Sequence, residues 1–180
     1  MTTPRTVLIT GGTGFVCMNI AETLLTRGDS VVLFARHAPP AALLREFDAL
    51  PGRLIFACGD VTDAASLAAV IRQHHITDLI HGAAVTPSQA AEYQNPVSIM
   101  QINCTGVLNA LEAARQTGVG RFLYLGSVSG YGQTCFESDV LIEGESLGNP
   151  HTLYELSKFT GERLVQRYRA LFGMDAALLR

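Results

Sequence analysis

The sequence predicts an α/β fold in which helices cover both faces of a parallel sheet, giving three α/β/α layers. Two observations lead to this prediction. Short apolar runs alternate strictly with longer segments of helical periodicity along the 180 residues. The short runs are apolar throughout, as expected for parallel strands that are buried on both faces. Because crossovers between parallel strands are right-handed, we expect a doubly wound sheet that forms one domain over residues 1–180.

Six strands are expected, and each is a short run rich in β-branched and other apolar residues. In chain order they are TVLIT at 6–10, SVVLFAR at 30–36, RLIFACGD at 53–60, TDLIHGAA at 77–84, RFLYLGS at 121–127 and MDAALLR at 174–180.

Five helices are expected between the strands, because apolar residues recur there at helical spacing. They lie at about 15–27, within 38–50, and at 63–74, 96–118 and 154–173. Gly28 and Gly118 are typical helix stops, prolines open the second helix, and an acidic residue opens the third. The longest irregular segment is 132–153, and loops of this length inside a compact domain are usually functional.

Composition and charge argue against several classes of protein. Hydrophobic residues make up 48% of the chain and charged residues 16%, which is typical of an ordered globular domain. A net charge of -3 without a basic run gives no reason to expect a nucleic-acid partner. The apolar runs are too short to span a bilayer, and the N-terminus lacks a secretory signal. The four cysteines, at 17, 58, 104 and 135, form no Cys-x-x-Cys pair. This spacing favours reduced thiols in a cytosolic protein over disulfides or zinc.

A glycine-rich turn, TGGTGFVC, joins the first strand to the first helix. Gly11 and Gly14 have the spacing of the first two glycines in a dinucleotide-binding fingerprint, where the backbone must approach a pyrophosphate closely. Phe15 and Val16 open the helix, whose N-terminus would offer free N–H groups to an anion. The alternative is an ordinary tight turn. Cys17 stands where the third glycine would be, either as a buried spacer or as a thiol activated by the helix N-terminus.

Two further residues bear on the choice of dinucleotide. The second strand ends without the acidic residue that usually binds the 2′-hydroxyl of NAD, and it carries Arg36 instead. A guanidinium suits a 2′-phosphate, so NADP is favoured over NAD, unless Arg36 is an exposed residue without a ligand. Asp60 closes the third strand, where its carboxylate would either bind the adenine amine or serve as a turn or helix cap.

The segment YELSK contains the only lysine of the chain, four residues after a tyrosine on a predicted helix. Tyr154 and Lys158 therefore share a helix face. A phenol with an ordinary pKa of about 10 is a poor acid or base at neutral pH, but a nearby cation lowers that pKa. Ser127, at the carboxyl end of the fifth strand, would hold a substrate oxygen beside Tyr154, and Ser129 is a weaker candidate. The alternatives are a surface lysine beside a core tyrosine, and an ordinary turn serine.

Taken together, these segments resemble the NAD(P)-dependent epimerase/dehydratase family, the extended branch of the short-chain dehydrogenase/reductase superfamily. GDVTD resembles its adenine-side segment, which implies cofactor contacts at Asp60 and Val61. HGAAV resembles its strand end on the nicotinamide side, which implies contacts at Ala83 and Ala84. NCTGVLNALEAAR resembles a family helix in which Asn103 is a buried polar residue that supports the catalytic site.

The resemblance implies an enzyme in which hydride moves between the nicotinamide and a carbinol carbon. Tyr154 would exchange the hydroxyl proton, Ser127 would hold the oxygen, and Lys158 would tune Tyr154 and anchor the cofactor ribose. The favoured substrate is a nucleotide sugar, and the alternatives are NADPH-dependent reduction of a ketone or aldehyde and a non-catalytic dinucleotide sensor. Family members are usually longer, so we expect this chain to be the cofactor-binding part without the C-terminal substrate lobe. A homodimer through the helices at 96–118 and 154–173 is also expected.

Overall fold

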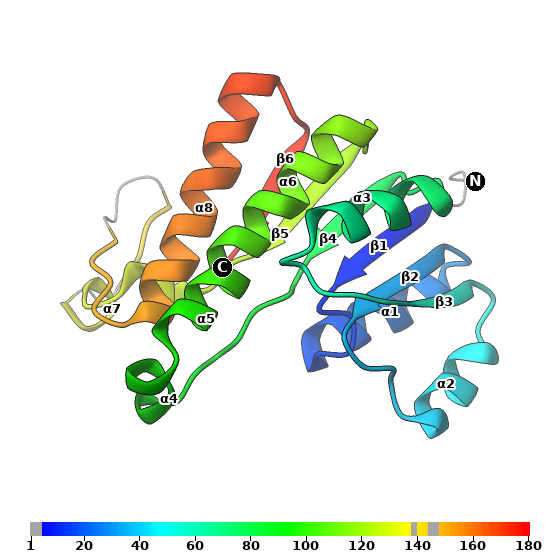
Figure 1. The fold of residues 1–180 in the computed structure, drawn as a ribbon, viewed down its shortest axis with the longest axis horizontal. Coiled ribbons are helices and arrows are strands. Elements are labelled where there is room, and N and C mark those ends of the chain that lie inside the picture. Colours follow the sequence, from blue (N-terminus) through cyan, green and yellow to red (C-terminus); the bar gives the residue numbers. More distant parts are fainter. Residues whose placement is uncertain (1–4, 138–139, 144–147) are drawn as a thin grey trace.

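The structure is a computed structural model that describes residues 5–137, 140–143 and 148–180 (Figure 1). Within these residues six parallel strands form one sheet in the order β3-β2-β1-β4-β5-β6. The strands are β1 Thr6–Thr10, β2 Ser30–Ala35, β3 Arg53–Cys58, β4 Asp78–His81, β5 Arg121–Leu125 and β6 Ala176–Leu179. The strand order reverses between β1 and β4, so the predicted doubly wound parallel sheet is confirmed.

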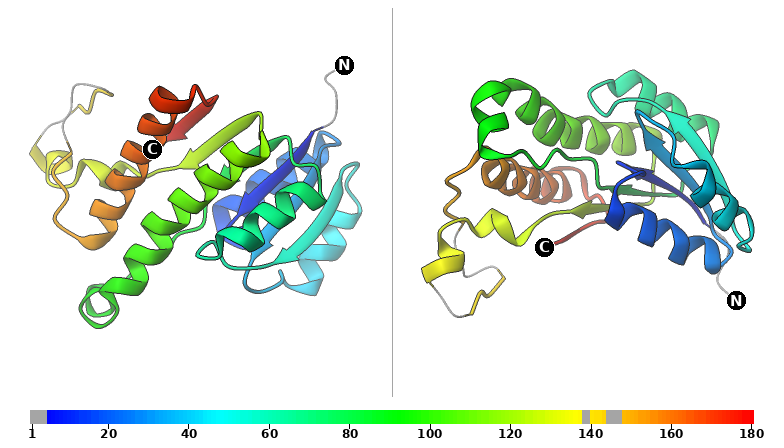
Figure 2. Two further views of the ribbon diagram at one scale, coloured as in Figure 1. Left: turned by 45° about the horizontal axis from the view of Figure 1, so that its top comes forward. Right: turned by 90° about the horizontal axis from the view of Figure 1, so that it is seen from below.

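Helices cover the two faces of the sheet separately (Figure 2). One face packs against α1 (Phe15–Thr26) and α2 (Ala41–Asp48), with a core that includes Val7, Ile9 and Phe47. The other face packs against the remaining long helices, α3 Ala64–Gln73, α6 Gly106–Thr117 and α8 Leu153–Phe172. Val7, Leu8 and Ile9 of β1 point alternately into the two cores and are buried, which explains why the middle of the strand is apolar.

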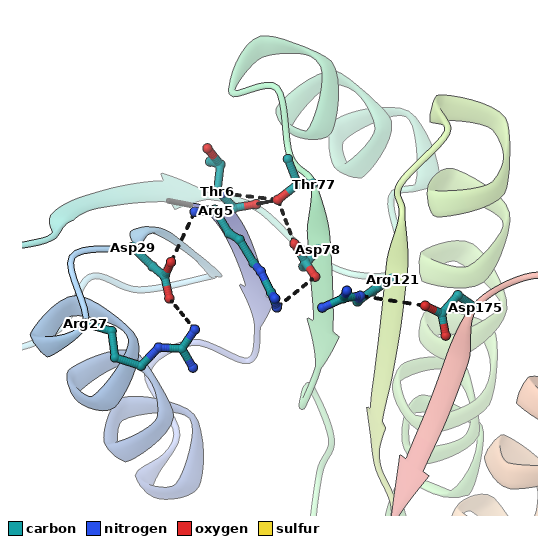
Figure 3. Close-up of polar contacts among 8 residues, drawn as sticks. All are labelled: Arg5, Thr6, Arg27, Asp29, Thr77, Asp78, Arg121 and Asp175. Atoms are coloured by element: carbon teal, nitrogen blue, oxygen red, sulfur yellow. Dashed lines mark hydrogen bonds and ion pairs between the residues drawn. The ribbon is translucent and has the colours of Figure 1, made fainter. Parts of the chain in front are cut away.

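The amino edge of the sheet carries a row of ion pairs (Figure 3). Arg5 lies 3.7 Å from Asp78, and Arg121 lies 3.7 Å from Asp175, so each pair joins the amino ends of two neighbouring strands. Thr77 donates a hydrogen bond to the carbonyl of Thr6 at 3.1 Å, which ties β1 to β4 at the same edge. Exposed ion pairs contribute little to stability. The two hollows described below, which could bind a ligand, lie at the opposite edge of the sheet, where the strands end.

The segment 96–118 differs from the single helix that we expected. It begins as α5 (Pro96–Met100), widens into a π-helical turn, η1 (Gln101–Thr105), and continues as α6. Its end is as predicted, because Gly118 adopts a left-handed conformation with φ 74°. The short helix α4 (Gln89–Gln94), capped by Ser88, was not expected.

The first strand ends where predicted, the second and sixth predicted strands run one residue too far at the carboxyl edge, and the third, fourth and fifth run two to three residues too far. The third strand ends at Cys58 rather than 60, and the fourth ends at His81 rather than 84. The chain leaves the sheet there to form the walls of the crevice described below. The predicted loop 132–153 contains α7 (Thr134–Glu137), and its residues 138–139 and 144–147 lie outside the described residues. Among the described residues, no helix combines the length and hydrophobicity needed to cross a bilayer.

Candidate active site

Two adjoining hollows open at the carboxyl edge of the sheet, where the strand order reverses. The first has a volume of about 280 Å³ and the second about 540 Å³, and both are lined by Gly14, Gly82 and Ala84. Every residue that we predicted to bind cofactor lines one of them. The first holds Gly11, Gly14, Arg36, Asp60, Val61, Ala83 and Ala84, and the second holds Gly14, Phe15, Val16, Ala84, Tyr154 and Lys158.

The glycine loop has the conformation that a close backbone approach requires. Gly11 has φ 66°, and a Cβ atom added there would lie 2.6 Å from the Cα of Ala83. Gly14 is the N-cap of α1 and offers no side-chain hydrogen bond to the helix, while Phe15 and Val16 are exposed. The first N–H groups of a helix have no partner within it, so this end of α1 is suited to a pyrophosphate.

Cys17 fills the position of the third glycine as a packed side chain. It is buried, and its thiol donates a hydrogen bond to the carbonyl of Thr10 at 3.7 Å. A Cβ atom at Gly82 would collide with its sulfur, so the glycine after β4 makes room for the cysteine on α1. Burial raises the pKa of the Cys17 thiol to about 11, which favours the spacer interpretation over the reactive thiol.

The adenine side of the first hollow contains Arg36 and Asp60. Arg36 follows β2 and is exposed to solvent. One oxygen of Asp60 accepts hydrogen bonds from the backbone N–H and hydroxyl of Thr62 at 2.9 and 2.8 Å. These bonds, chiefly the one from the backbone, lower the pKa of Asp60. Asp60 therefore stabilises a turn, whereas the N-cap of α3 is Asp63. Because Asp60 also lines the hollow, its adenine contact stays a prediction.

Helix α8 places Tyr154 in its first turn and Lys158 one turn later. The helix begins with a capping box, in which Thr152 and Glu155 each accept a hydrogen bond from the other's backbone. Lys158 is buried, and its ammonium donates to the carbonyl of Leu125 at 2.9 Å. The same nitrogen lies 6.0 Å from the ring centre of Tyr154. Burial lowers the pKa of Lys158 to about 8. Tyr154 and Lys158 both line the second hollow.

Ser127 follows Gly126, which lines the second hollow together with Tyr154 and Lys158, but Ser127 itself lines neither hollow. It is the N-cap of η2 (Val128–Tyr131), and its hydroxyl accepts a hydrogen bond from the N–H of Ser129 at 3.1 Å. The turn role that we considered for this serine is therefore present. A role in binding a substrate oxygen stays a prediction.

Asn103 supports the site without facing either hollow. It is buried in the π-helical turn η1, where its oxygen accepts from the N–H of Val85 at 2.7 Å. Its amide nitrogen donates to the carbonyl of Val85 at 2.9 Å and to the hydroxyl of Ser157 at 3.0 Å. Asn103 thus joins the loop after β4 to α8, and its role in supporting the catalytic site stays a prediction.

Sequence reasoning missed three polar residues beneath or beside the hollows. His81 is completely buried, shares a 2.9 Å hydrogen bond with Thr10, and has its pKa lowered to about 3 by burial. Glu162 is buried on α8 and pairs with Arg180, which lines the second hollow. The only local signals were a histidine at the end of an apolar strand and a glutamate four residues after Lys158.

Comparison with known proteins places the chain in a family. The model of the NAD dependent epimerase/dehydratase family matches residues 7–180, and the chain belongs to this family. UDP-glucose 4-epimerase of Erwinia amylovora is 30% identical over 165 residues, which cover 90% of this chain and 48% of that protein. A 3-beta-hydroxysteroid dehydrogenase of Mycolicibacterium neoaurum is 31% identical over 97% of this chain and 46% of its own length.

Solved structures agree with this assignment. UDP-glucose 4-epimerase of Thermus thermophilus, solved as a complex with NAD, has a TM-score of 0.77 and 29% identity. The match covers 97% of this chain and 54% of that one. The Brucella ovis UDP-glucose 4-epimerase in complex with NAD has a TM-score of 0.83 at 23% identity, which supports the fold. The chain thus spans about half the length of the relatives that it matches.

Proposed function

We propose that this chain is the cofactor-binding part of an NAD(P)-dependent epimerase or dehydratase that acts on a nucleotide sugar. The observation that carries the proposal is that Tyr154 and Lys158 line a hollow which adjoins the glycine loop. The UDP-sugar relatives support the substrate class. The cofactor fits the residues present, because Gly11 leaves a cradle that a Cβ atom would fill and α1 offers free N–H groups.

The chain's own residues have distinct parts in this proposal. When bound, the nicotinamide would accept or supply a hydride. Tyr154 would exchange a proton with the substrate hydroxyl at its phenolic oxygen. Lys158 would hold the ribose hydroxyls and favour the phenolate, since its ammonium is desolvated and lies beside the ring. Ser127 would orient the substrate oxygen from the turn after β5.

The test compares Tyr154→Phe with Tyr93→Phe, a control at an exposed tyrosine. UDP-glucose is added to the chain loaded with NAD⁺, and reduced nicotinamide is followed by its near-ultraviolet absorbance. We expect Tyr154→Phe to lower the rate by at least about 100-fold, because general acid–base catalysis contributes about that much or more. Cofactor affinity should change less than about threefold. An unchanged rate in Tyr154→Phe would contradict the acid–base role and favour a dinucleotide sensor.

A second candidate is an NADPH-dependent carbonyl reductase, which Arg36 and the steroid dehydrogenase relatives favour. We expect Arg36→Gln to weaken NADP⁺ binding by about 10-fold or more while leaving NAD⁺ binding nearly unchanged, since only NADP⁺ carries the 2′-phosphate. Arg45→Gln, on the exposed part of α2, is the control. Calorimetric titration measures both ligands. Equal losses for the two dinucleotides would refute a preference for NADP.

We also infer a homodimer through α6 and α8, because Leu108 and Leu156 are 39% and 40% exposed on these helices. Sedimentation equilibrium that finds only monomers would contradict it. A cytoplasmic location is supported by the four cysteines, all of which are free thiols.

A further inference from the structure

Helix α8 carries a buried carboxylate one turn beyond Lys158. Glu162 is 3% exposed, and its two oxygens accept hydrogen bonds from Nε and Nη2 of Arg180 at 2.9 and 2.8 Å. This is the bidentate geometry that makes a guanidinium–carboxylate pair strong. Arg180 follows β6 and lines the hollow that also contains Tyr154 and Lys158. The ion pair therefore lies directly beside the proposed catalytic residues.

The same ion pair reaches the turn that carries Ser127. The third guanidinium nitrogen of Arg180 donates to the hydroxyl of Tyr131, the last residue of η2. The guanidinium also stacks on the Tyr131 ring, with 4.4 Å between its carbon and the ring centre. At the other end of the turn, a Cβ atom at Gly126 would lie 3.2 Å from a Glu162 oxygen. The pair thus bonds to one end of the Ser127 turn and lies close to the other.

Lys158 is surrounded mainly by groups that are neutral near pH 8. Burial raises the pKa of Cys17, on α1, to about 11 and lowers that of His81, on β4, to about 3. Burial also raises the pKa of Tyr124, on β5, whose ring centre lies 5.2 Å from the Lys158 ammonium. The ring centre of Tyr154, on α8 itself, lies 6.0 Å from the same ammonium.

The charges of Glu162 and Arg180 remain beside these neutral groups. The Glu162 carboxylate opposes the fall in the Lys158 pKa that burial causes. Because Arg180 is paired with that carboxylate, the two charges largely balance each other as long as both residues are present.

We propose that Glu162 and Arg180 are positioning residues of the site, which fasten the Ser127 turn to α8 and set a balanced charge one helical turn from Lys158. The catalytic consequence rests on the proposed function. The link between the ion pair and Lys158 does not, because it can be measured without turnover. A single lysine in the chain makes this measurement direct.

The test follows the side-chain NMR signal of Lys158 in a sample labelled at lysine. Because the chain has one lysine, a single resonance is titrated. In Glu162→Gln the unbalanced guanidinium disfavours the ammonium, so the pKa of Lys158 falls below its wild-type value. In Arg180→Gln the unbalanced carboxylate favours the ammonium, so that pKa rises. We expect shifts of opposite sign and of about half a unit or more. Glu22→Gln removes an exposed carboxylate of α1 and should leave the pKa unchanged.

Shifts of the same sign, or no shift in either variant, would overturn the charge link. If one of the two variants does not fold, the sign of the shift in the other decides. The opposite shifts are expected even if UDP-glucose does not reduce NAD⁺ bound to the chain. The absence of NAD⁺ reduction would count against the proposed function alone.

Tyr131→Phe tests the fastening of the turn, because it removes one hydroxyl and no charge. We expect faster amide hydrogen exchange over 126–132 and unchanged exchange over 106–117, with the pKa of Lys158 preserved. Where hydride transfer is measurable, kcat should fall several-fold while the Kd for dinucleotide stays the same. Unchanged exchange over 126–132 would overturn this part of the inference.

Discussion

His81 shows how much a single buried side chain can contribute to the behaviour of the domain. The ring lies in the core between β1 and β5, near the rings of Phe122 and Tyr124. One ring nitrogen is hydrogen-bonded to Thr10, and the surrounding core favours the neutral imidazole over the protonated form. The position of His81 at the end of an apolar strand did not predict this role, because its partner is 71 residues away.

Acid should therefore destabilise the fold through His81 before the carboxylates contribute. The pKa of His81 is lowered from 6.5 to about 3, so the unfolded state binds the extra proton between these values. Stability then falls as pH falls through this window. We expect the free energy of unfolding to drop by about 1.4 kcal/mol per pH unit between pH 6 and 5, as linkage requires. Urea denaturation across this range measures the slope.

The matched variants are His81→Asn and His75→Asn, the second at an exposed histidine. His81→Asn lowers stability throughout, since it disturbs packing, but it should remove most of the slope. His75→Asn should keep the slope. A slope that survives in His81→Asn would show that another group takes up the proton.

At the scale of elements, α8 depends on its first turn, because that turn carries Tyr154. The capping box of Thr152 and Glu155 satisfies N–H groups that the helix leaves free. We expect Thr152→Ala to lower the free energy of unfolding by about 1 kcal/mol, the usual cost of losing such a cap. Thr26→Ala, at the exposed end of α1, is the control and should be nearly neutral. Equal urea midpoints for the two variants would contradict the importance of the cap.

Elements that depend on neighbouring residues could be predicted from the sequence. Elements that depend on contacts between residues far apart in the chain could not. The apolar strands and the helix stop at Gly118 follow from neighbouring residues alone. The π-helical turn η1 forms around Asn103, whose partners Val85 and Ser157 lie 18 and 54 residues away. No periodicity within 96–118 reports those contacts. The helix α4 was missed because it is a short helix whose N-cap, Ser88, resembles an ordinary loop residue.

At the scale of the whole molecule, the location of the candidate site could be predicted from the topology of the sheet. Parallel strands bring their carboxyl ends to one edge, so the glycine loop, Asp60 and Tyr154 could be assigned to one crevice from the order of elements. The polar groups behind that crevice were not predictable. Glu162 and Arg180 are identified by a contact between α8 and the end of β6, which no sequence spacing encodes.

Gly11, which follows β1, lies against Ala83 in the segment after β4, and this contact yields a prediction for the whole domain. Gly11 and Gly28 both have positive φ, 66° and 86°. An added Cβ would meet nothing within 4 Å at Gly28, whereas at Gly11 it would lie 2.6 Å from the backbone of Ala83 beyond β4. We expect Gly28→Ala to cost about 1 kcal/mol of stability, which is the backbone strain alone, and to leave dinucleotide binding intact.

Gly11→Ala carries the same strain and also forces β1 away from β4 at the crevice. We expect it to cost more than about 2 kcal/mol and to abolish measurable binding of NAD⁺ and NADP⁺ in calorimetric titration. The wild-type chain and Gly28→Ala should gain about 2.7 kcal/mol of stability at a dinucleotide concentration 100-fold above Kd, and Gly11→Ala should gain none. If Gly11→Ala bound dinucleotide as tightly as Gly28→Ala, the crevice between β1 and β4 could not be the cofactor site, because the clash lies in its wall.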